Sequence, residues 1–165
     1  MRSPFLYSPG MPVRQYTCFA LSSHSASATE MTAVLGIEPD RTAFRSSRRG
    51  EPLPVPVAHR WIVECRDRGL SLDEQIAYIL ERLAPQTDAI AALARRLDAE
   101  PEAGPSAVLE VVRYFNEAGQ HPGHQVEPSK EEPTRKLGWH LGRDVLDFLQ
   151  ATGAAVDIDE YEEGS

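Results

Sequence analysis

The segment GIEPDRTAFRSSRRGEP, residues 36–52, carries side chains that could bind an anion. Its four arginines fall within nine residues: Arg41, Arg45, Arg48 and Arg49. A guanidinium is planar and offers paired donors to a phosphate or a carboxylate, although the spacing is not that of a phosphate-binding P-loop. Two interpretations stay open. The segment is a recognition site for an anion or an acidic partner, or it is a solvated loop whose arginines pair with acids such as Glu38 and Asp40.

The ending DIDEYEE contains the second candidate for chemistry, the pair Asp157 and Asp159. On a strand these two carboxylates share one face, because side chains alternate with a period of two. Paired carboxylates could bind a divalent cation or act as acid and base. No third ligand accompanies them at a recognisable spacing, so we predict no metal. The alternative is a solvated strand face whose acids discourage pairing of strand edges between molecules.

Histidines and cysteines give weaker signals. His121 and His124 could start a zinc site, but no partner motif of the Cys-x-x-Cys kind accompanies them. Cys18 and Cys65 stand inside apolar runs, where free cysteine behaves as a small buried hydrophobe. We therefore expect these cysteines to pack in the core, and we predict neither a catalytic residue nor a cofactor.

Aromatic residues near the arginines could form a stacking platform for a ligand. Phe44 lies inside the arginine segment, and Trp61 follows it on a predicted strand. Alternatively, Trp61 is a core residue and Phe44 anchors the loop to the body of the domain.

Charge is unevenly distributed along the 165 residues, whose formal net charge is −8. Residues 1–70 carry a net +3 and residues 71–165 a net −11. The acidic total argues against nucleic-acid binding, because a polyanion would be repelled. The sequence contains no apolar run long enough for a membrane span and no signal peptide, so the expected location is the cytoplasm.

Hydrophobic patterns predict the elements that position these candidates. Alternating apolar residues indicate strands at 15–23, 59–66, 106–117 and 154–161, with a further short strand at 137–141. Helices are expected at 27–36, 71–100 and 143–153, the first two opening with serine–glutamate capping boxes. Pro85 should divide 71–100 into two helices, and the last helix should bury Val145, Leu146 and Leu149.

These elements predict a single α+β domain over residues 15–161. It would be a two-layer sandwich, with one mixed or antiparallel sheet of four to five strands and helices mainly on one face. A ferredoxin-like strand order is one variant. Residues 1–14 and 162–165 are expected to be flexible tails, and 119–136 an exposed polar insertion.

The chain resembles an uncharacterised bacterial family catalogued as domain of unknown function 4279. The resemblance rests on YTCFALSS, LGIEPDRTAFRSSRRG, HRWIVECR, SLDEQIAYILERLAPQTDAIAAL, AVLEVVRYF and LGWHLGRDVLDFLQATGAAVDIDEY, in that order. These pieces span about residues 15–161. The resemblance implies a fold and a bacterial origin, and it implies no reaction.

Three functions are compatible with these observations. The first is a non-enzymatic binding module for a protein or a small anionic ligand, with an immunity- or antitoxin-like role as one form. The second is an enzyme acting on a phosphorylated or acidic small molecule, in which Arg41, Arg45 and Arg49 bind the anion and Asp157 or Asp159 is the base. The third is a structural or oligomerising domain. The sequence does not predict an oligomeric state.

Overall fold

A computed structural model describes residues 13–45, 58–101, 104–116 and 138–163. The strands are β1 (Val13–Ser23), β2 (Arg41–Arg45), β3 (Ala58–Cys65), β4 (Ala107–Asn116) and β5 (Ala155–Glu163). The helices are α1 (Ala28–Leu35), α2 (Leu72–Leu83), the short 3-10 turn η1 (Ala84–Gln86), α3 (Thr87–Asp98) and α4 (Arg143–Thr152).

The strands form one mixed sheet in the order β2-β3-β1-β4-β5. All neighbours are antiparallel except β4 and β5, which run parallel. From β1 to β4 the chain follows a β-α-β-β-α-β order, if α2, η1 and α3 are taken as one helical segment. In this order β3 lies between β1 and β2, which is the ferredoxin-like arrangement. The α4–β5 unit then extends the sheet beside β4.

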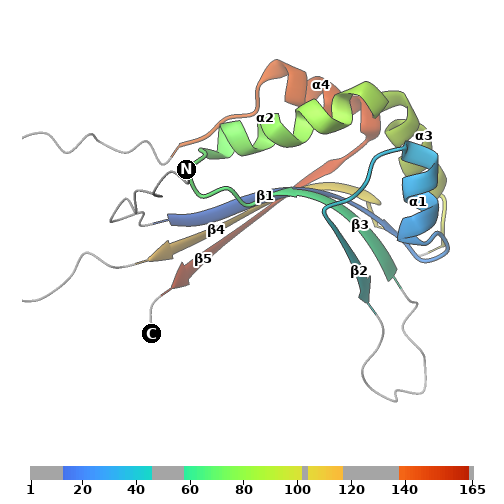
Figure 1. Cartoon of the computed structure of the whole chain (residues 1–165), viewed down its shortest axis with the longest axis horizontal. Helices are drawn as coiled ribbons and strands as arrows, with labels where there is room; N and C mark the ends of the chain where they lie inside the picture. The colour runs from blue at the N-terminus through green and yellow to red at the C-terminus, as the bar shows by residue number, and fades with distance from the viewer. Residues whose placement is uncertain (1–12, 46–57, 102–103, 117–137, 164–165) are drawn as a thin grey trace, which may run out of the picture.

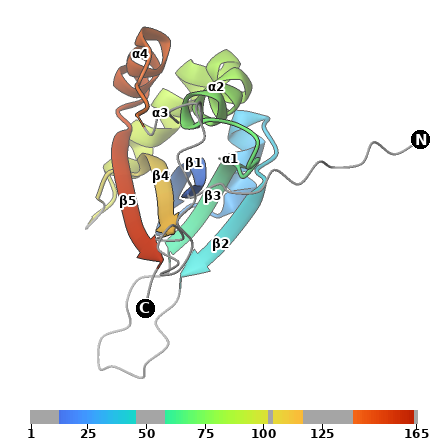
Figure 2. The ribbon, with the colours of Figure 1, turned by 90° about the vertical axis from the view of Figure 1, so that its left-hand side faces the viewer.

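The helices cover a single face of the sheet, as Figures 1 and 2 show from two directions. The other face carries no helix among the described residues. The structure is therefore the predicted two-layer α+β sandwich, and the uncovered side is called the open face below.

Local sequence signals explain where the helices begin and end. Ser27 and Glu30 form the predicted capping box of α1, and Gly36 ends that helix at a φ of 65°. Ser71 and Glu74 cap α2 in the same way. The predicted break near Pro85 is confirmed, because this proline lies in η1 between α2 and α3.

The main core lies between the helices and the covered face of the sheet. Phe19, Trp61, Val63 and Val111 point into it from three strands, and none of their side chains is exposed. The Trp61 indole Nε1 donates to Thr32 Oγ1 on α1 at 3.1 Å, so the polar atom of this buried ring is satisfied.

Several predicted details were wrong. Arg41–Arg45 is the edge strand β2 and not a loop, because its backbone pairs with β3. Residues 138–141 form no strand. Leu146 is half-exposed, and Phe148 takes its place in the core.

The predicted limits of the domain also shift. Residues 13–14 belong to β1 and residues 162–163 to β5, so the expected tails overlap the sheet at both ends. The predicted insertion at 119–136 lies outside the described residues. Within the part of the chain that the structure describes, no helix has the length and apolar character needed to cross a bilayer.

Candidate functional site

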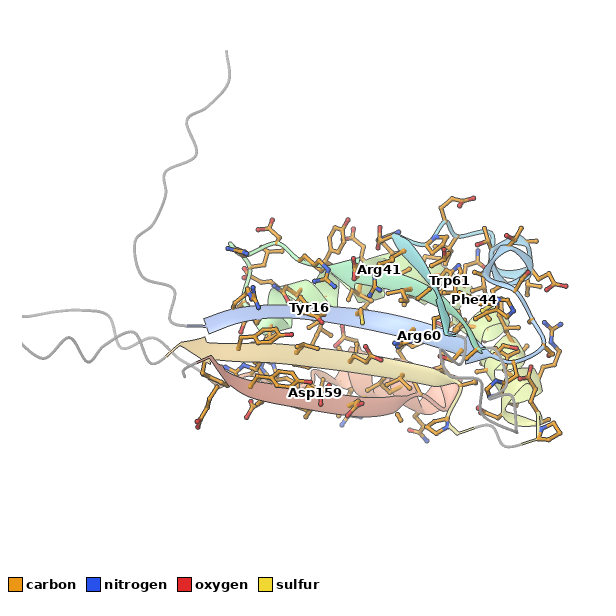
Figure 3. The ribbon with its side chains drawn as sticks, turned by 90° about the horizontal axis from the view of Figure 1, so that it is seen from below. Tyr16, Arg41, Phe44, Arg60, Trp61 and Asp159 are labelled. Carbon is orange, nitrogen blue, oxygen red and sulfur yellow. The ribbon has the colours of Figure 1, made fainter. Side chains whose placement is uncertain are left out.

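The open face of the sheet combines charged and aromatic side chains from all five strands, and Figure 3 looks onto it. Residue alternation and strand register assign the side chains that point to this face: Arg41, Arg60, Glu64, Tyr16, Cys18, Glu110, Tyr114, Asp157, Asp159 and Tyr161. A small buried cluster of Cys18, Ala20 and Ile62 lies among them. The face therefore mixes a small apolar cluster with charged and aromatic groups, as recognition surfaces do.

One end of this face contains a cavity of about 350 Å³, which we call the arginine–tyrosine cavity. Its lining residues are Arg14, Gln15, Tyr16, Arg66, Arg68 and Tyr114. They come from the start of β1, the chain just after β3 and the end of β4. The pairing of β1 with both β3 and β4 brings these three segments together.

Two guanidiniums of the cavity stack on tyrosine rings. The Arg66 Cζ lies 3.9 Å from the centre of the Tyr16 ring, and the Arg14 Cζ lies 4.4 Å from that of Tyr114. The Tyr114 ring also stacks on Tyr161, with 5.1 Å between centroids. The N–H groups of a stacked guanidinium lie in its own plane and point away from the aromatic ring, so they can still donate to an anion. The tyrosines therefore restrict the arginines without occupying all of their donors.

The charge of the cavity favours an anion. Three of its lining residues are arginines, and the lining contains no aspartate or glutamate. Glu64 lies nearby, with its Oε1 3.0 Å from Arg66 Nε, and so fixes one edge of that guanidinium. Burial raises the pKa of Tyr16, and the neighbouring Tyr114 adds to this effect while Arg66 opposes it. At neutral pH Tyr16 is therefore a neutral phenol that can donate a hydrogen bond.

The centre of the open face holds an ion pair between Arg60 and Glu110. Cys18 is buried beside this pair, and its thiol donates to Glu110 Oε2 at 3.3 Å. Burial and the negative charge of Glu110 raise the pKa of Cys18 to about 12. The thiol is consequently protonated at neutral pH and is a poor nucleophile.

Of the predicted arginine site, the structure describes only the side chain of Arg41. Arg41 lies on β2, and its Nη2 is 3.5 Å from Glu64 Oε2. The backbone of Arg45 ends β2, while Arg48 and Arg49 lie outside the described residues. Asp40, an expected partner of these arginines, instead binds Arg82 of α2, with 2.5 Å between Oδ2 and Nη1.

The aromatic candidates separate clearly by burial. Trp61 is completely buried against α1, so its assignment to a recognition surface was wrong and the core interpretation holds. Phe44 is 62% exposed, and its ring makes an edge-to-face contact with the His59 ring, with 5.3 Å between centroids. Phe44 and Trp61 also point to the covered side of the sheet, opposite the cavity.

Asp157 and Asp159 share one face of β5, as expected, and both are exposed. Strands β5 and β2 are the two edges of the sheet, so four strand spacings, or about 19 Å, separate these aspartates from Arg41. Figure 3 shows Asp159 and Arg41 towards opposite edges of the open face. Arg41 and these aspartates, which the enzyme hypothesis combined, therefore do not form one site.

Metal and thiol chemistry find little support among the described residues. No group of three potential metal ligands occurs among them. Cys65 is buried in the core, as predicted. His121 and His124 lie outside the described part of the chain.

The residues of the arginine–tyrosine cavity were not recognised in the sequence. Tyr16 falls within the predicted strand at 15–23 and Arg66 at the end of the one at 59–66, and neither was a binding candidate. One signal was available, because arginine and tyrosine recur at the ends of three predicted strands. The register that brings these ends together is a property of the folded sheet.

Comparison with known proteins gives one match. The family model described as a domain of unknown function, DUF4279, matches residues 14–163. No curated protein and no solved structure matches the chain.

Proposed function

The chain belongs to the family described as domain of unknown function DUF4279, and we propose that it is a non-catalytic binding module that recognises an anionic group. The ligand group is a phosphate or a carboxylate, and it binds in the arginine–tyrosine cavity. One observation carries the proposal: Arg14, Arg66 and Arg68 meet in one concavity without an acid in its lining. In a protein of net charge −8, such a positive concavity focuses the local field on an anion.

The chemistry of the lining supports recognition more than reaction. Its side chains are guanidiniums, phenols and one amide. These groups donate hydrogen bonds to an anion, but the guanidiniums cannot act as bases at neutral pH. Burial and the Glu110 carboxylate keep the nearby Cys18 thiol protonated, which also argues against nucleophilic catalysis at this face.

The size of the group limits its affinity. A free phosphate has five non-hydrogen atoms, and small ligands gain at most about 1.5 kcal/mol per atom. The dissociation constant for inorganic phosphate should therefore be no tighter than a few micromolar. A tighter physiological ligand needs further contacts, which the open face beside the cavity can offer.

The anionic group has two possible sources, a small molecule or a protein partner. A bacterial cytosolic protein partner would fit the immunity- or antitoxin-like role proposed from charge. Both sources present the same chemistry to Arg66 and Arg68, so they are separated by experiment. A short peptide with one phosphoserine can be compared with inorganic phosphate and with the unphosphorylated peptide.

Isothermal titration calorimetry of the full chain with inorganic phosphate tests the site itself. Arg66→Gln/Arg68→Gln should weaken phosphate binding at least tenfold, because two charge-assisted contacts are lost. Arg95→Gln/Arg96→Gln on the exposed face of α3 removes the same charge elsewhere and should change it less than twofold. Equal weakening in both variants, or no saturable binding by the wild-type chain, would exclude the site.

The phosphopeptide titration identifies the source of the anionic group. A phosphopeptide that binds at least tenfold more tightly than phosphate, and loses this affinity in Arg66→Gln/Arg68→Gln, favours a protein partner. Equal affinity for the phosphopeptide and phosphate favours a small molecule.

A further inference from the structure

The helix layer contains a second concavity, between α2 and α4 on the side away from the open face. Figures 1 and 2 show these helices as neighbours at the outside of the layer. The groove between them has a volume of about 570 Å³, within the usual range of ligand pockets. It is separated from the arginine–tyrosine cavity by the sheet.

Two facing helical stripes form this groove. Ala77, Leu80, Glu81 and Ala84 follow one stripe at and just beyond the end of α2, and Asp144, Asp147, Phe148 and Ala151 follow the other on α4. Both sets have the spacing i, i+3, i+4, i+7, which places them along one helical face. The groove is therefore elongated along two helices.

The floor of the groove is apolar, and small alanine side chains form part of its sides. Leu80 and Phe148 form its base, and the alanines leave room above them. Helices approach to about 8–10 Å between axes when the side chains at the contact are small. An added helix could therefore lie between α2 and α4 and cover Leu80 and Phe148.

The charge along the groove has one sign. Glu81, Asp144 and Asp147 are exposed carboxylates of its lining, which contains no arginine or lysine. An apolar floor between acidic margins is complementary to a segment with an apolar stripe flanked by basic side chains.

We propose that the α2–α4 groove docks a basic amphipathic helix of a protein partner. The backbone groups of α2 and α4 are already bonded within their helices, so the groove offers no free strand edge for an extended segment. A helix satisfies its own backbone and presents anchors at i, i+3, i+4 and i+7. This docking surface is independent of the anion site on the open face.

A synthetic helix tests the proposal on the full chain. The probe is an 18-residue fluorescent peptide with leucines along one helical face and lysines elsewhere, titrated by fluorescence anisotropy. Glu81→Gln/Asp144→Asn/Asp147→Asn should weaken its binding about tenfold through the loss of three charge pairs. The matched control Asp157→Asn/Asp159→Asn/Glu162→Gln changes the net charge equally on the distant strand β5 and should weaken it less than twofold.

A further variant and two further peptides complete the test. Ala151→Trp fills the groove from an exposed position and should abolish binding. A peptide with glutamates in place of the lysines, and a peptide of the same composition without helical periodicity, should bind at least tenfold more weakly. The proposal is overturned if the β5 control weakens binding as much as the groove variant, or if either altered peptide binds equally well. It is also overturned if the wild-type chain self-associates and the only effect of Ala151→Trp is to dissociate it. The groove would then bind a second copy of this chain.

Discussion

The Sγ atom of Cys18 lies 3.3 Å from Glu110 Oε2, at the centre of a sheet face that no helix covers among the described residues. Arg60 closes over the same carboxylate as its ion-pair partner. The thiol is therefore buried between this ion pair and the small apolar cluster that it forms with Ala20 and Ile62. This arrangement fixes the protonation state of Cys18.

We predict that Cys18 resists alkylation until strongly alkaline pH. Burial and Glu110 together raise its pKa to about 12, and the thiolate is the reactive form. In a Cys65→Ser background, Glu110→Gln should lower the pH midpoint of iodoacetamide labelling because it removes the carboxylate charge. Burial should still keep that midpoint above the ordinary thiol value.

Glu38→Gln serves as the control for this prediction, since Glu38 is an exposed acid away from Cys18. It should leave the labelling midpoint unchanged. A wild-type midpoint near that of a free thiol would contradict the assigned role of Glu110.

Glu100 should stabilise the fold above pH 4 and lose this effect in acid. Burial would raise its pKa, but hydrogen bonds from Ser23 Oγ at 2.7 Å, Ser25 Oγ and the His24 amide outweigh burial and lower it. A lowered folded pKa gives stability above the unfolded value of about 4.3, and that stability disappears as the pH falls through the folded pKa.

The corresponding measurement compares urea unfolding of Glu100→Gln and the wild-type chain. We expect a loss of about 1–2 kcal/mol in the free energy of unfolding at pH 7, from the charged hydrogen bonds. The two curves should converge towards pH 2. A difference that stays constant with pH would mean that the carboxylate charge of Glu100 is not involved.

Phe44 and Trp61 should differ greatly in their contribution to stability. Trp61→Ala removes a completely buried ring and should cost about 3–5 kcal/mol in the free energy of unfolding. Phe44→Ala removes a ring that is 62% exposed and should cost less than about 1 kcal/mol. Urea unfolding of both variants measures this difference. Similar losses in the free energy of unfolding would show that Phe44 does anchor β2.

The helices were predictable because their signals are local. Ser27 with Glu30 caps the first turn of α1, and Ser71 with Glu74 caps the first turn of α2. Pro85 likewise marks the break between α2 and α3 within its own neighbourhood. Such signals depend on residues three or four positions apart, so one sequence is sufficient to find them.

Strand β2 and the cavity depend on contacts between distant segments. The five residues of β2 lie in a polar, arginine-rich segment without a clear apolar alternation, and only pairing with β3 makes them a strand. Arg14 faces Tyr114 across the β1–β4 register, although about a hundred positions separate them in the chain. No local pattern predicts that register, because side-chain alternation fixes a residue's face but not its partner.

Tyr16 provides a direct signal for ligand binding in the arginine–tyrosine cavity. Burial already raises its pKa, with Tyr114 adding to the rise and Arg66 opposing it. A bound phosphate would place negative charge near the phenol and draw on the same Arg66 guanidinium. Both effects disfavour the phenolate, so saturating phosphate should raise the pKa of Tyr16 further.

The measurement is a spectrophotometric titration of phenolate absorbance with and without phosphate at constant ionic strength. The phosphate-dependent shift should vanish when both tyrosines of the cavity are replaced, in Tyr16→Phe/Tyr114→Phe. It should persist in Tyr161→Phe, because Tyr161 lies outside the cavity lining and the pKa of its own phenol is raised chiefly by Asp159. A shift that survives in Tyr16→Phe/Tyr114→Phe, or a Tyr16 pKa that falls when phosphate is added, would place the bound anion elsewhere on the protein.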